Sequence, residues 1–230
     1  LVNVKGADFT GTFVKLTADV TLTNATWTSS IGCTIDGTHD IKSGANLRAF
    51  PGTFDGDNHP LTFDGTGTVK PLFGYVRNTT IKNLNIQGTE NVVFEDHGLI
   101  STIEGVGLNN DAAIIDHVTL KSGTKTTKSG LVGATMTTNP YAAASAGFLT
   151  TITNCVVEEG CIIGVNGDQN MIGGIAGRLI CEIDNCVSYA DVYGKNYVGG
   201  ILGTMDNAMG AAIVTNSAFH GTVTGTNNVG

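Results

Sequence analysis

The stretch GGIAGRLICEIDNC, from Gly173 to Cys186, contains the two short patterns that decide the fold of this chain. The first is a glycine followed by two apolar residues and a small residue, and the second is Ile-x-Asn followed by an apolar residue. Both patterns return along the chain, which indicates an array of internal repeats. The first pattern occurs at Gly98–Ser101, Gly130–Gly133, Gly174–Gly177 and Gly200–Gly203, with an imperfect copy at Pro71–Gly74.

The second pattern places one polar residue at an equivalent position in each repeat. These residues are Asn83, His117, Asn154, Asn185 and Asn216, separated by 34, 37, 31 and 31 residues. A repeat of this length cannot bury its apolar side chains alone, so neighbouring repeats must stack. Stacking at the strand spacing of about 4.8 Å turns equivalent positions into columns. We therefore expect these five residues to form a structural ladder at a turn, with hydrogen bonds along the stack.

The composition indicates many short strands joined by tight turns. The chain has 32 glycines and 4 prolines in 230 residues, and only 14% of its residues are charged. Glycine suits tight turns, whereas the abundant valine, isoleucine and threonine favour strands. Connections between parallel strands are overwhelmingly right-handed. The predicted fold is therefore all-β, a right-handed parallel β-helix (a solenoid) in which the glycines of the first pattern allow tight bends between faces.

The first part of the chain does not follow the repeat. Alternating residues at Val14–Leu22 predict a strand, and the only tryptophan, Trp27, follows it. Repeat arrays need a terminal element that covers the open end of the core. We expect residues 1–70 to be an N-terminal capping segment and residues 71–230 to be the repeats of the same domain. Since the last two residues repeat Val198-Gly199, we expect the array to continue further.

Variable lengths between the patterns predict loops. Residues 134–148 and 160–171 are insertions relative to the other repeats. In stacked-repeat proteins such insertions gather on one flank, which is often the binding flank.

Charge and cysteine usage exclude several classes of function. A net charge of −8 argues against nucleic-acid binding and against anionic membrane surfaces. No apolar stretch approaches the roughly 18 residues that a membrane helix needs, so we expect no membrane insertion. The five cysteines contain no CxxC pair, which leaves little support for zinc. We expect no metal and no cofactor, and buried free thiols are favoured over disulfides for Cys33, Cys155, Cys161, Cys181 and Cys186.

Two acidic groups are candidates for chemistry. Asp55, Asp57 and Asp64 supply carboxylates within ten residues, but they lack the remaining pattern of a calcium loop and are ordinary turn residues. The segments Glu95–His97 and Asp116-His117 place carboxylates beside histidines, and glycoside hydrolases use paired carboxylates. We favour the interpretation that both segments are solvated turn residues and that His117 is a substitution in the ladder. We therefore assign no catalytic residue.

Three tyrosines are candidate ligand-binding residues. Tyr189, Tyr193 and Tyr197 alternate around one repeat. If they are exposed, their rings can stack on sugar rings; if they are buried, they are packing residues.

The repeat pattern resembles a known family. The sequence Gly-Gly-Ile-x-Gly followed by Ile-x-Asn-Cys, at Gly173 to Cys186, is similar to the GLUG-motif repeats of bacterial surface proteins. Gly52–His59, Leu72–Val76 and Thr80–Leu84 resemble the segment that introduces such arrays, so the likeness runs from about Thr12 to Gly230. The chain departs from the family pattern at the Pro71 tetrad and at His117, which replaces the ladder asparagine.

The resemblance implies a non-catalytic stalk or adhesin module exported to the bacterial cell surface. Its loops would bind a host glycan or surface protein, and further repeats or domains of the same polypeptide would adjoin it. The alternative is a carbohydrate-active β-helix enzyme, either a polysaccharide lyase or a glycoside hydrolase. A lyase needs cations beside an acidic sugar, and the chain has only three arginines, Arg48, Arg77 and Arg178.

Overall fold

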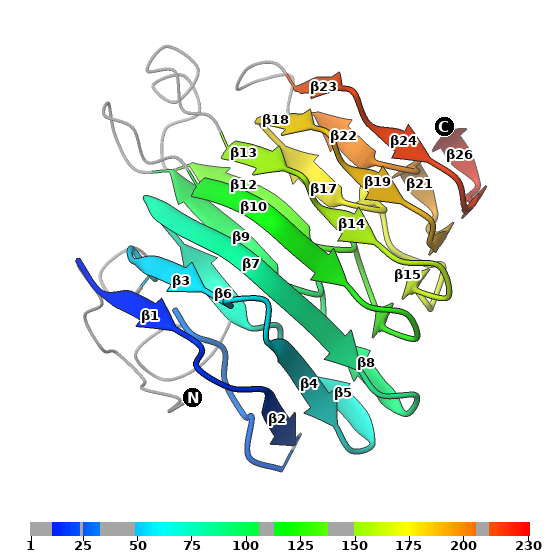
Figure 1. The fold of residues 1–230 in the computed structure, drawn as a ribbon. Coiled ribbons are helices and arrows are strands. Elements are labelled where there is room, and N and C mark those ends of the chain that lie inside the picture. Colours follow the sequence, from blue (N-terminus) through cyan, green and yellow to red (C-terminus); the bar gives the residue numbers. More distant parts are fainter. Residues whose placement is uncertain (1–10, 24, 33–48, 106–112, 138–149, 206–211) are drawn as a thin grey trace.

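The computed structural model describes residues 11–23, 25–32, 49–105, 113–137, 150–205 and 212–230. Within these ranges the chain forms 26 strands arranged in four sheets (Figure 1). The strands pair in parallel throughout. The described part contains no helix, and so none that could cross a membrane. The predicted all-β class and its parallel pairing are therefore confirmed.

The largest sheet has 12 strands that lie in two rows. The first row is β1 (Phe13–Lys15), β3 (Thr53–Asp55), β7 (Thr79–Gly88), β10 (Ala113–Leu120), β13 (Thr150–Thr153), β18 (Cys181–Asp184) and β23 (Ile213–Thr215). The second row runs beside the C-terminal halves of β7 and β10 and contains β2 (Val20–Thr23), β4 (Pro60–Asp64), β14 (Val156–Val157), β19 (Val187–Ser188) and β24 (Ala218–Phe219).

Three smaller sheets complete the structure. The six-stranded sheet contains β5 (Gly67–Val69), β8 (Val92–Phe94), β11 (Lys125–Thr126), β15 (Ile162–Ile163), β20 (Asp191–Tyr193) and β25 (Thr222–Thr224). The five-stranded sheet contains β6 (Phe73–Val76), β9 (Ile100–Gly105), β12 (Val132–Thr137), β17 (Ala176–Leu179) and β22 (Leu202–Met205). The three-stranded sheet contains β16 (Ile172–Gly173), β21 (Asn196–Gly199) and β26 (Asn227–Val229).

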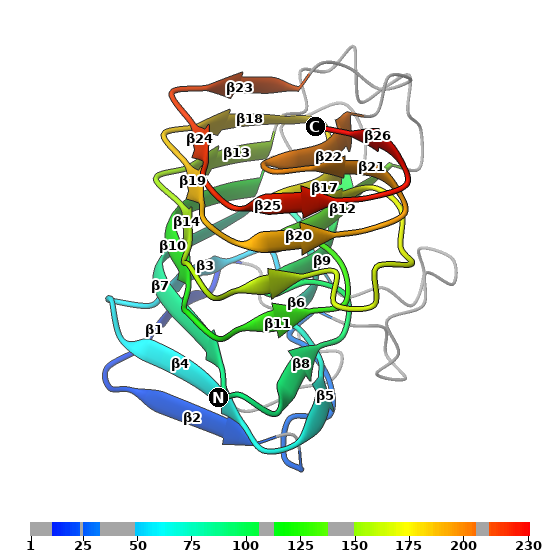
Figure 2. The same cartoon turned by 90° about the vertical axis from the view of Figure 1, so that its right-hand side faces the viewer.

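The chain visits these sheets in turn and then returns to the largest one. In one passage it forms β18 and β19 in the largest sheet, β20 in the six-stranded sheet, β21 in the three-stranded sheet and β22 in the five-stranded sheet, before it returns as β23. Each strand lies beside its counterpart from the previous passage (Figure 2). Equivalent positions of successive repeats are therefore hydrogen-bonded neighbours, and this places their side chains in columns.

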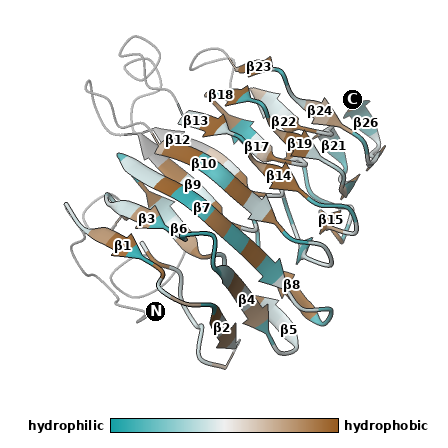
Figure 3. Ribbon diagram, in the orientation of Figure 1, coloured by the Kyte–Doolittle hydropathy of each residue, from teal (hydrophilic) through white to brown (hydrophobic). Residues whose placement is uncertain are grey.

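The interior is filled by columns of apolar side chains. One column contains Phe54, Ile81, Ile115, Ile152 and Ile183, which pair in register and are all 0% exposed. Residues on either side of each column member point outward, so apolar and polar segments alternate along β7 and β10 (Figure 3). Burial of such columns is the main favourable contribution to the stability of the stack.

Glycines of the first pattern are required by close approach between repeats. A Cβ atom on Gly130 would lie 1.9 Å from the carbonyl oxygen of Gly174, and one on Gly174 would lie 2.1 Å from that of Gly200. None of these three glycines has a positive φ angle. These glycines lie at bends of the chain, as the sequence predicts, but a side chain is excluded there by lack of space and not by a positive φ angle.

The N-terminal end of the core is covered by aromatic residues. The ring of Trp27 packs edge-on against Phe63, and its Nε1 donates to the carbonyl oxygen of Lys70 at 3.1 Å. Strands β3, β4 and β5, within the segment predicted as a cap, pair with β7 and β8 in the same parallel manner as the later repeats. The stacked arrangement therefore already includes residues 53–69.

The last repeat leaves its interior columns open. Val214 in β23 is 45% exposed and Val229 in β26 is 44% exposed, whereas their register partners Ile183 and Val198 are 0% and 1% exposed. Apolar positions that are covered in every earlier repeat are thus accessible at this end of the described chain.

Candidate functional site

The five ladder residues predicted from the sequence lie in one column of the largest sheet. The flanking strand pairs align Asn83 with His117, and then with Asn154, Asn185 and Asn216. All five have left-handed backbone conformations, with φ between 47° and 54°. Asparagine tolerates this conformation better than most residues because its short amide bonds locally. The column marks the bend between the two strand rows of the sheet.

Side chains of this column form hydrogen bonds along the stack. Asn185 donates from Nδ2 to Oδ1 of Asn154 at 2.7 Å, and Asn154 donates to Oδ1 of Asp116 at 2.8 Å. Asn216 donates not to the ladder residue Asn185 but to Oδ1 of the preceding residue, Asp184, at 2.7 Å. Asn154 is half-buried and Asn185 is exposed, so the ladder lies on the outer surface of the sheet.

Carboxylates beside the ladder are held in the charged form. Asp116 accepts from Asn154, from His117 and from the Thr153 hydroxyl, which is 2.8 Å away. Burial alone would raise the pKa of Asp116, but these hydrogen bonds outweigh burial and lower it. Hydrogen bonds from Thr215 and Asn216 likewise lower the pKa of Asp184. These carboxylates bridge neighbouring repeats and are structural.

A second asparagine ladder, which the sequence patterns above did not reveal, follows the three-stranded sheet. Asn227 donates from Nδ2 to Oδ1 of Asn196 at 2.8 Å, and Asn196 donates in the same way to Asn170 at 2.8 Å. The signal in the sequence is Asn-x-aliphatic-Gly, which occurs at 170–173, 196–199 and 227–230. The second residue of this pattern also has a positive φ angle, for example 57° at Tyr197.

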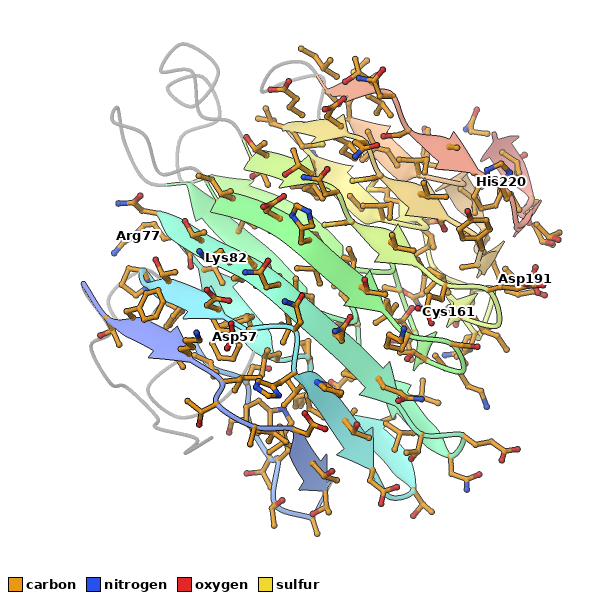
Figure 4. The ribbon with its side chains drawn as sticks, viewed as in Figure 1. Asp57, Arg77, Lys82, Cys161, Asp191 and His220 are labelled. Carbon is orange, nitrogen blue, oxygen red and sulfur yellow. The ribbon has the colours of Figure 1, made fainter. Side chains whose placement is uncertain are left out.

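The three acidic candidates Asp55, Asp57 and Asp64 each contact a different partner. Asp55 contacts Lys82, Asp57 forms an ion pair with Lys15 at 3.0 Å, and Asp64 accepts from the Thr89 hydroxyl. Among the described residues no three metal-binding side chains come together. Figure 4 shows Asp57 and Lys82 on the outer face of the largest sheet.

The two acid–histidine segments lie in different parts of the fold. Asp116 and His117 belong to β10 of the largest sheet, whereas residues 95–97 connect the six-stranded sheet to the five-stranded one. Asp96 forms an ion pair with Lys128 at 2.6 Å, and His97 is buried. The structure does not bring these segments together into one active site.

The four described cysteines are free and buried. Cys155 and Cys186 occupy equivalent positions in neighbouring repeats, and the backbone N–H of Cys155 donates to Sγ of Cys186 at 3.4 Å. Burial raises the pKa of the Cys161 and Cys181 thiols to about 12, so both are protonated at neutral pH. Cys33 and Arg48 lie outside the described residues, as do residues 138–148 of the predicted insertion.

The three tyrosines occupy three different places. Tyr189 follows β19 at the corner between the largest and the six-stranded sheets and is 42% exposed. Tyr193 ends β20 and is half-buried, while Tyr197 lies in β21 and is 44% exposed. They do not form a common surface. Of the three, Tyr189 lies beside a hollow.

Turn length creates this hollow. Four residues connect the sheets in the earlier repeats, at Lys121–Thr124 and Glu158–Cys161. Only two residues make the same connection in the last repeats, at Tyr189–Ala190 and His220–Gly221. The longer turns project further than the shorter ones, and a step results at the corner.

The corner hollow is the cavity at this step, lined by Glu159, Gly160, Tyr189, Asp191, His220, Gly221 and Thr222, with a volume of about 500 Å³. The rings of Tyr189 and His220 stack with centroids 5.1 Å apart and planes inclined by 21°. Asp191 and His220 project from the same edge of the molecule (Figure 4). A neighbouring depression is lined by Ser122, Glu158, Glu159 and Tyr189.

Charge in the corner hollow is negative. Glu158, beside the hollow, contacts Lys121 and accepts from the Ser122 N–H at 3.0 Å. Burial alone would raise the pKa of Glu158, but these hydrogen bonds lower it. Glu159 and Asp191 line the hollow itself, where they supply acceptors for hydroxyl or ammonium groups. His220 and the hollow were missed from the sequence because no repeat pattern contains them.

Comparisons with known proteins found no matching family model, no match among curated proteins and no matching solved structure.

Proposed function

We propose that this chain is a right-handed parallel β-helix of the GLUG-repeat kind that serves as a non-catalytic stalk or adhesin module on a bacterial cell surface. Its parallel pairing and its return to the same sheet in every repeat support the β-helix. The right-handed sense follows from the strong bias of parallel connections. The stacked columns give a stiff body, which suits a stalk, and the resemblance of Gly173 to Cys186 to GLUG repeats supports the cell-surface location.

The corner hollow is the proposed binding site, and its ligand is a glycan. The single observation that carries this proposal is the stacked Tyr189–His220 pair in a hollow that also contains two carboxylates. Aromatic rings bury the apolar C–H face of a sugar, while the carboxylates accept hydrogen bonds from its hydroxyl groups and the Thr222 hydroxyl can accept or donate one. A binding site of this kind is mostly preformed and concave, as ligand sites usually are.

The charge of the hollow selects among glycans. Glu159 and Asp191 repel the carboxylate of a uronic or sialic acid, whereas they attract the ammonium group of an amino sugar. The proposed ligands are therefore neutral or amino-bearing sugars.

Further repeats of the same polypeptide are the proposed neighbours at the last described repeat. The exposed Val214 and Val229 and the unpaired edges of β23 and β26 support this arrangement, since another repeat in the same register would cover them. Such a repeat would also extend both asparagine ladders.

One observation favours a second candidate function, a carbohydrate-active enzyme. Glu159 and Asp191 line the same hollow, and glycoside hydrolases act with a pair of carboxylates. The two functions differ in whether the bound glycan is released intact or cleaved.

The test is a glycan-array screen of the purified chain, followed by incubation of each bound glycan with the chain and analysis of the products. Binding of neutral or amino sugars without cleavage is the expected result. Cleavage of a bound glycan would show that the chain is an enzyme and not an adhesin. Preferential binding of sialylated or uronate-containing glycans would contradict the assignment of the corner hollow as the binding site.

A further inference from the structure

A second hollow, which we call the His97 hollow, opens between the five-stranded sheet and the turn before β16. It has a volume of about 400 Å³, and its polar lining residues are His97, Lys128, Gln169, Asn170 and Arg178. None of the described residues that line it is acidic, although Asp96 pairs with Lys128 at its edge and the whole chain carries a net charge of −8. The His97 hollow is therefore the opposite of the corner hollow in the charge that it presents.

The imidazole of His97 is fixed in one orientation. His97 has an exposed fraction of only 7%, and its Nδ1 accepts a hydrogen bond from the backbone N–H of Ser129 at 3.1 Å. Because Nδ1 is an acceptor, the proton of the neutral ring is on Nε2. Burial, with a smaller effect of the charge on Lys128, lowers the pKa of His97 to about 4 against the opposing effects of Asp96 and of the bond from Ser129. At neutral pH His97 is an uncharged N–H donor.

Gly133 makes room for this donor. A Cβ atom at residue 133 would lie 2.3 Å from His97 Nε2 and 2.1 Å from the carbonyl oxygen of Ser101. Gly133 and His97 both line the hollow, and among the described residues no hydrogen-bond acceptor is found for Nε2. Among the described residues, Nε2 of His97 is not one of the fully buried side-chain atoms that lack a partner, so its N–H is accessible to a ligand or to water in the hollow.

The other polar groups of the hollow add positive charge and amide donors. Arg178 is half-buried in β17, and Lys128 forms an ion pair with Asp96 at 2.6 Å at the edge of the hollow. Asn170 accepts from Asn196 through its Oδ1 at 2.8 Å, so its Nδ2 is the group that can serve a ligand. Guanidinium and ammonium groups beside a directed N–H are the usual surroundings of a bound anion.

We propose that the His97 hollow binds the carboxylate or sulfate group of a small ligand, with the guanidinium of Arg178 and the ammonium of Lys128, which keeps its ion pair with Asp96, beside its charge and the Nε2–H of His97 donating to one of its oxygens. No bond is made or broken. This site is independent of the corner hollow and of the glycan that we propose there.

The test follows the imidazole N–H of His97 by proton–nitrogen NMR while glucuronate, inorganic sulfate or glucose is added. Glucuronate and sulfate are expected to shift the Nε2–H signal saturably, and glucose is expected to leave it unchanged. The anion with the higher affinity identifies the source of the charged group. A chain in which neither anion moves the signal, or in which glucose moves it equally, would overturn the proposal.

Two variants separate binding from folding. Arg178→Gln is expected to weaken the binding of the better anion about tenfold. The matched control is Lys125→Gln, which removes a cation from β11 outside the hollow and is expected to leave the affinity unchanged. Equal effects of the two substitutions would show that only the net charge matters, and that outcome would also overturn the proposal. The unchanged parts of each NMR spectrum show whether the variants are folded.

Discussion

The side-chain amide of Asn185 donates a hydrogen bond of 2.7 Å to Oδ1 of Asn154, its counterpart in the neighbouring repeat. Both residues also have left-handed backbone conformations, with φ of 51° and 54°. One residue type thus meets two requirements at this bend, tolerance of a positive φ angle and a bond to the next repeat. These two contributions can be separated by mutation.

Asn185→Ala is expected to lower the free energy of unfolding by about 1–2 kcal/mol, because it loses the hydrogen bond and places a Cβ-bearing residue without a local amide in the left-handed region. Asn185→Gly is expected to cost less, since glycine keeps the backbone conformation and loses only the bond. Urea denaturation measures both. If both variants match the wild type within the error of the measurement, the ladder does not contribute to stability.

Gly130→Ala is expected to destabilise the chain by about 2–3 kcal/mol, because the new Cβ would lie 1.9 Å from the carbonyl oxygen of Gly174. Gly123→Ala is the control: Gly123 has a positive φ of 84° but no atom within 4 Å of its Cβ position. Its cost is therefore only that of backbone strain, about 1 kcal/mol. Thermal unfolding compares them, and a Gly123 variant less stable than the Gly130 variant would contradict the close-approach explanation.

The free energy of unfolding is expected to decrease as the pH is lowered from 6.5 to about 4. In this range His97 is protonated in the unfolded chain but not in the folded chain. The folded pKa is below the unfolded value, so the contribution is present above pH 6.5 and is lost as the pH falls through the folded pKa. The total loss is about 3 kcal/mol for a shift of this size. Urea denaturation at several pH values measures the slope.

His97→Gln is expected to flatten this slope, even if it also lowers stability at every pH. A slope that persists in the His97 variant would assign the pH dependence to other groups, such as Asp96 or the carboxylates of the ladders.

The buried thiols are expected to resist alkylation in the folded chain. In a Cys33→Ser variant, which leaves the four described cysteines, iodoacetamide should modify few thiols before unfolding and all four after it, because burial keeps Cys161 and Cys181 protonated. Mass spectrometry counts the modified residues. Rapid modification of a native thiol would show that its repeat opens.

The parallel all-β arrangement could be predicted because the repeats place apolar residues at equivalent positions, as at Ile152 and Ile183. The second ladder could have been found from Asn170, Asn196 and Asn227, but three short patterns with variable middle residues are a weak signal. The position of the glycines at bends could be predicted, but a sequence does not show whether a glycine is required by a positive φ angle or by missing space. The carbonyl oxygen that faces Gly130 belongs to the next repeat, so no pattern within one repeat reveals this contact.

Both hollows depend on relationships between repeats that no single pattern contains. The corner hollow arises because the turn at Tyr189 is two residues shorter than the turn at Glu158. His220 then stacks on Tyr189 from the next repeat. The sequence predicts that His97 belongs to a solvated acidic turn. In the structure it is buried, and its Nδ1 accepts a hydrogen bond from the backbone of Ser129.

The most direct test of the proposed glycan-binding function is isothermal titration calorimetry of the best glycan-array ligand against the wild type, Tyr189→Asn and Tyr197→Asn. The two tyrosines are almost equally exposed, at 42% and 44%, but only Tyr189 lines the corner hollow. Loss of the aromatic ring at Tyr189 is expected to weaken binding by about tenfold or more, while the Tyr197 variant binds like the wild type. Equal affinity of all three chains would contradict binding at the corner hollow.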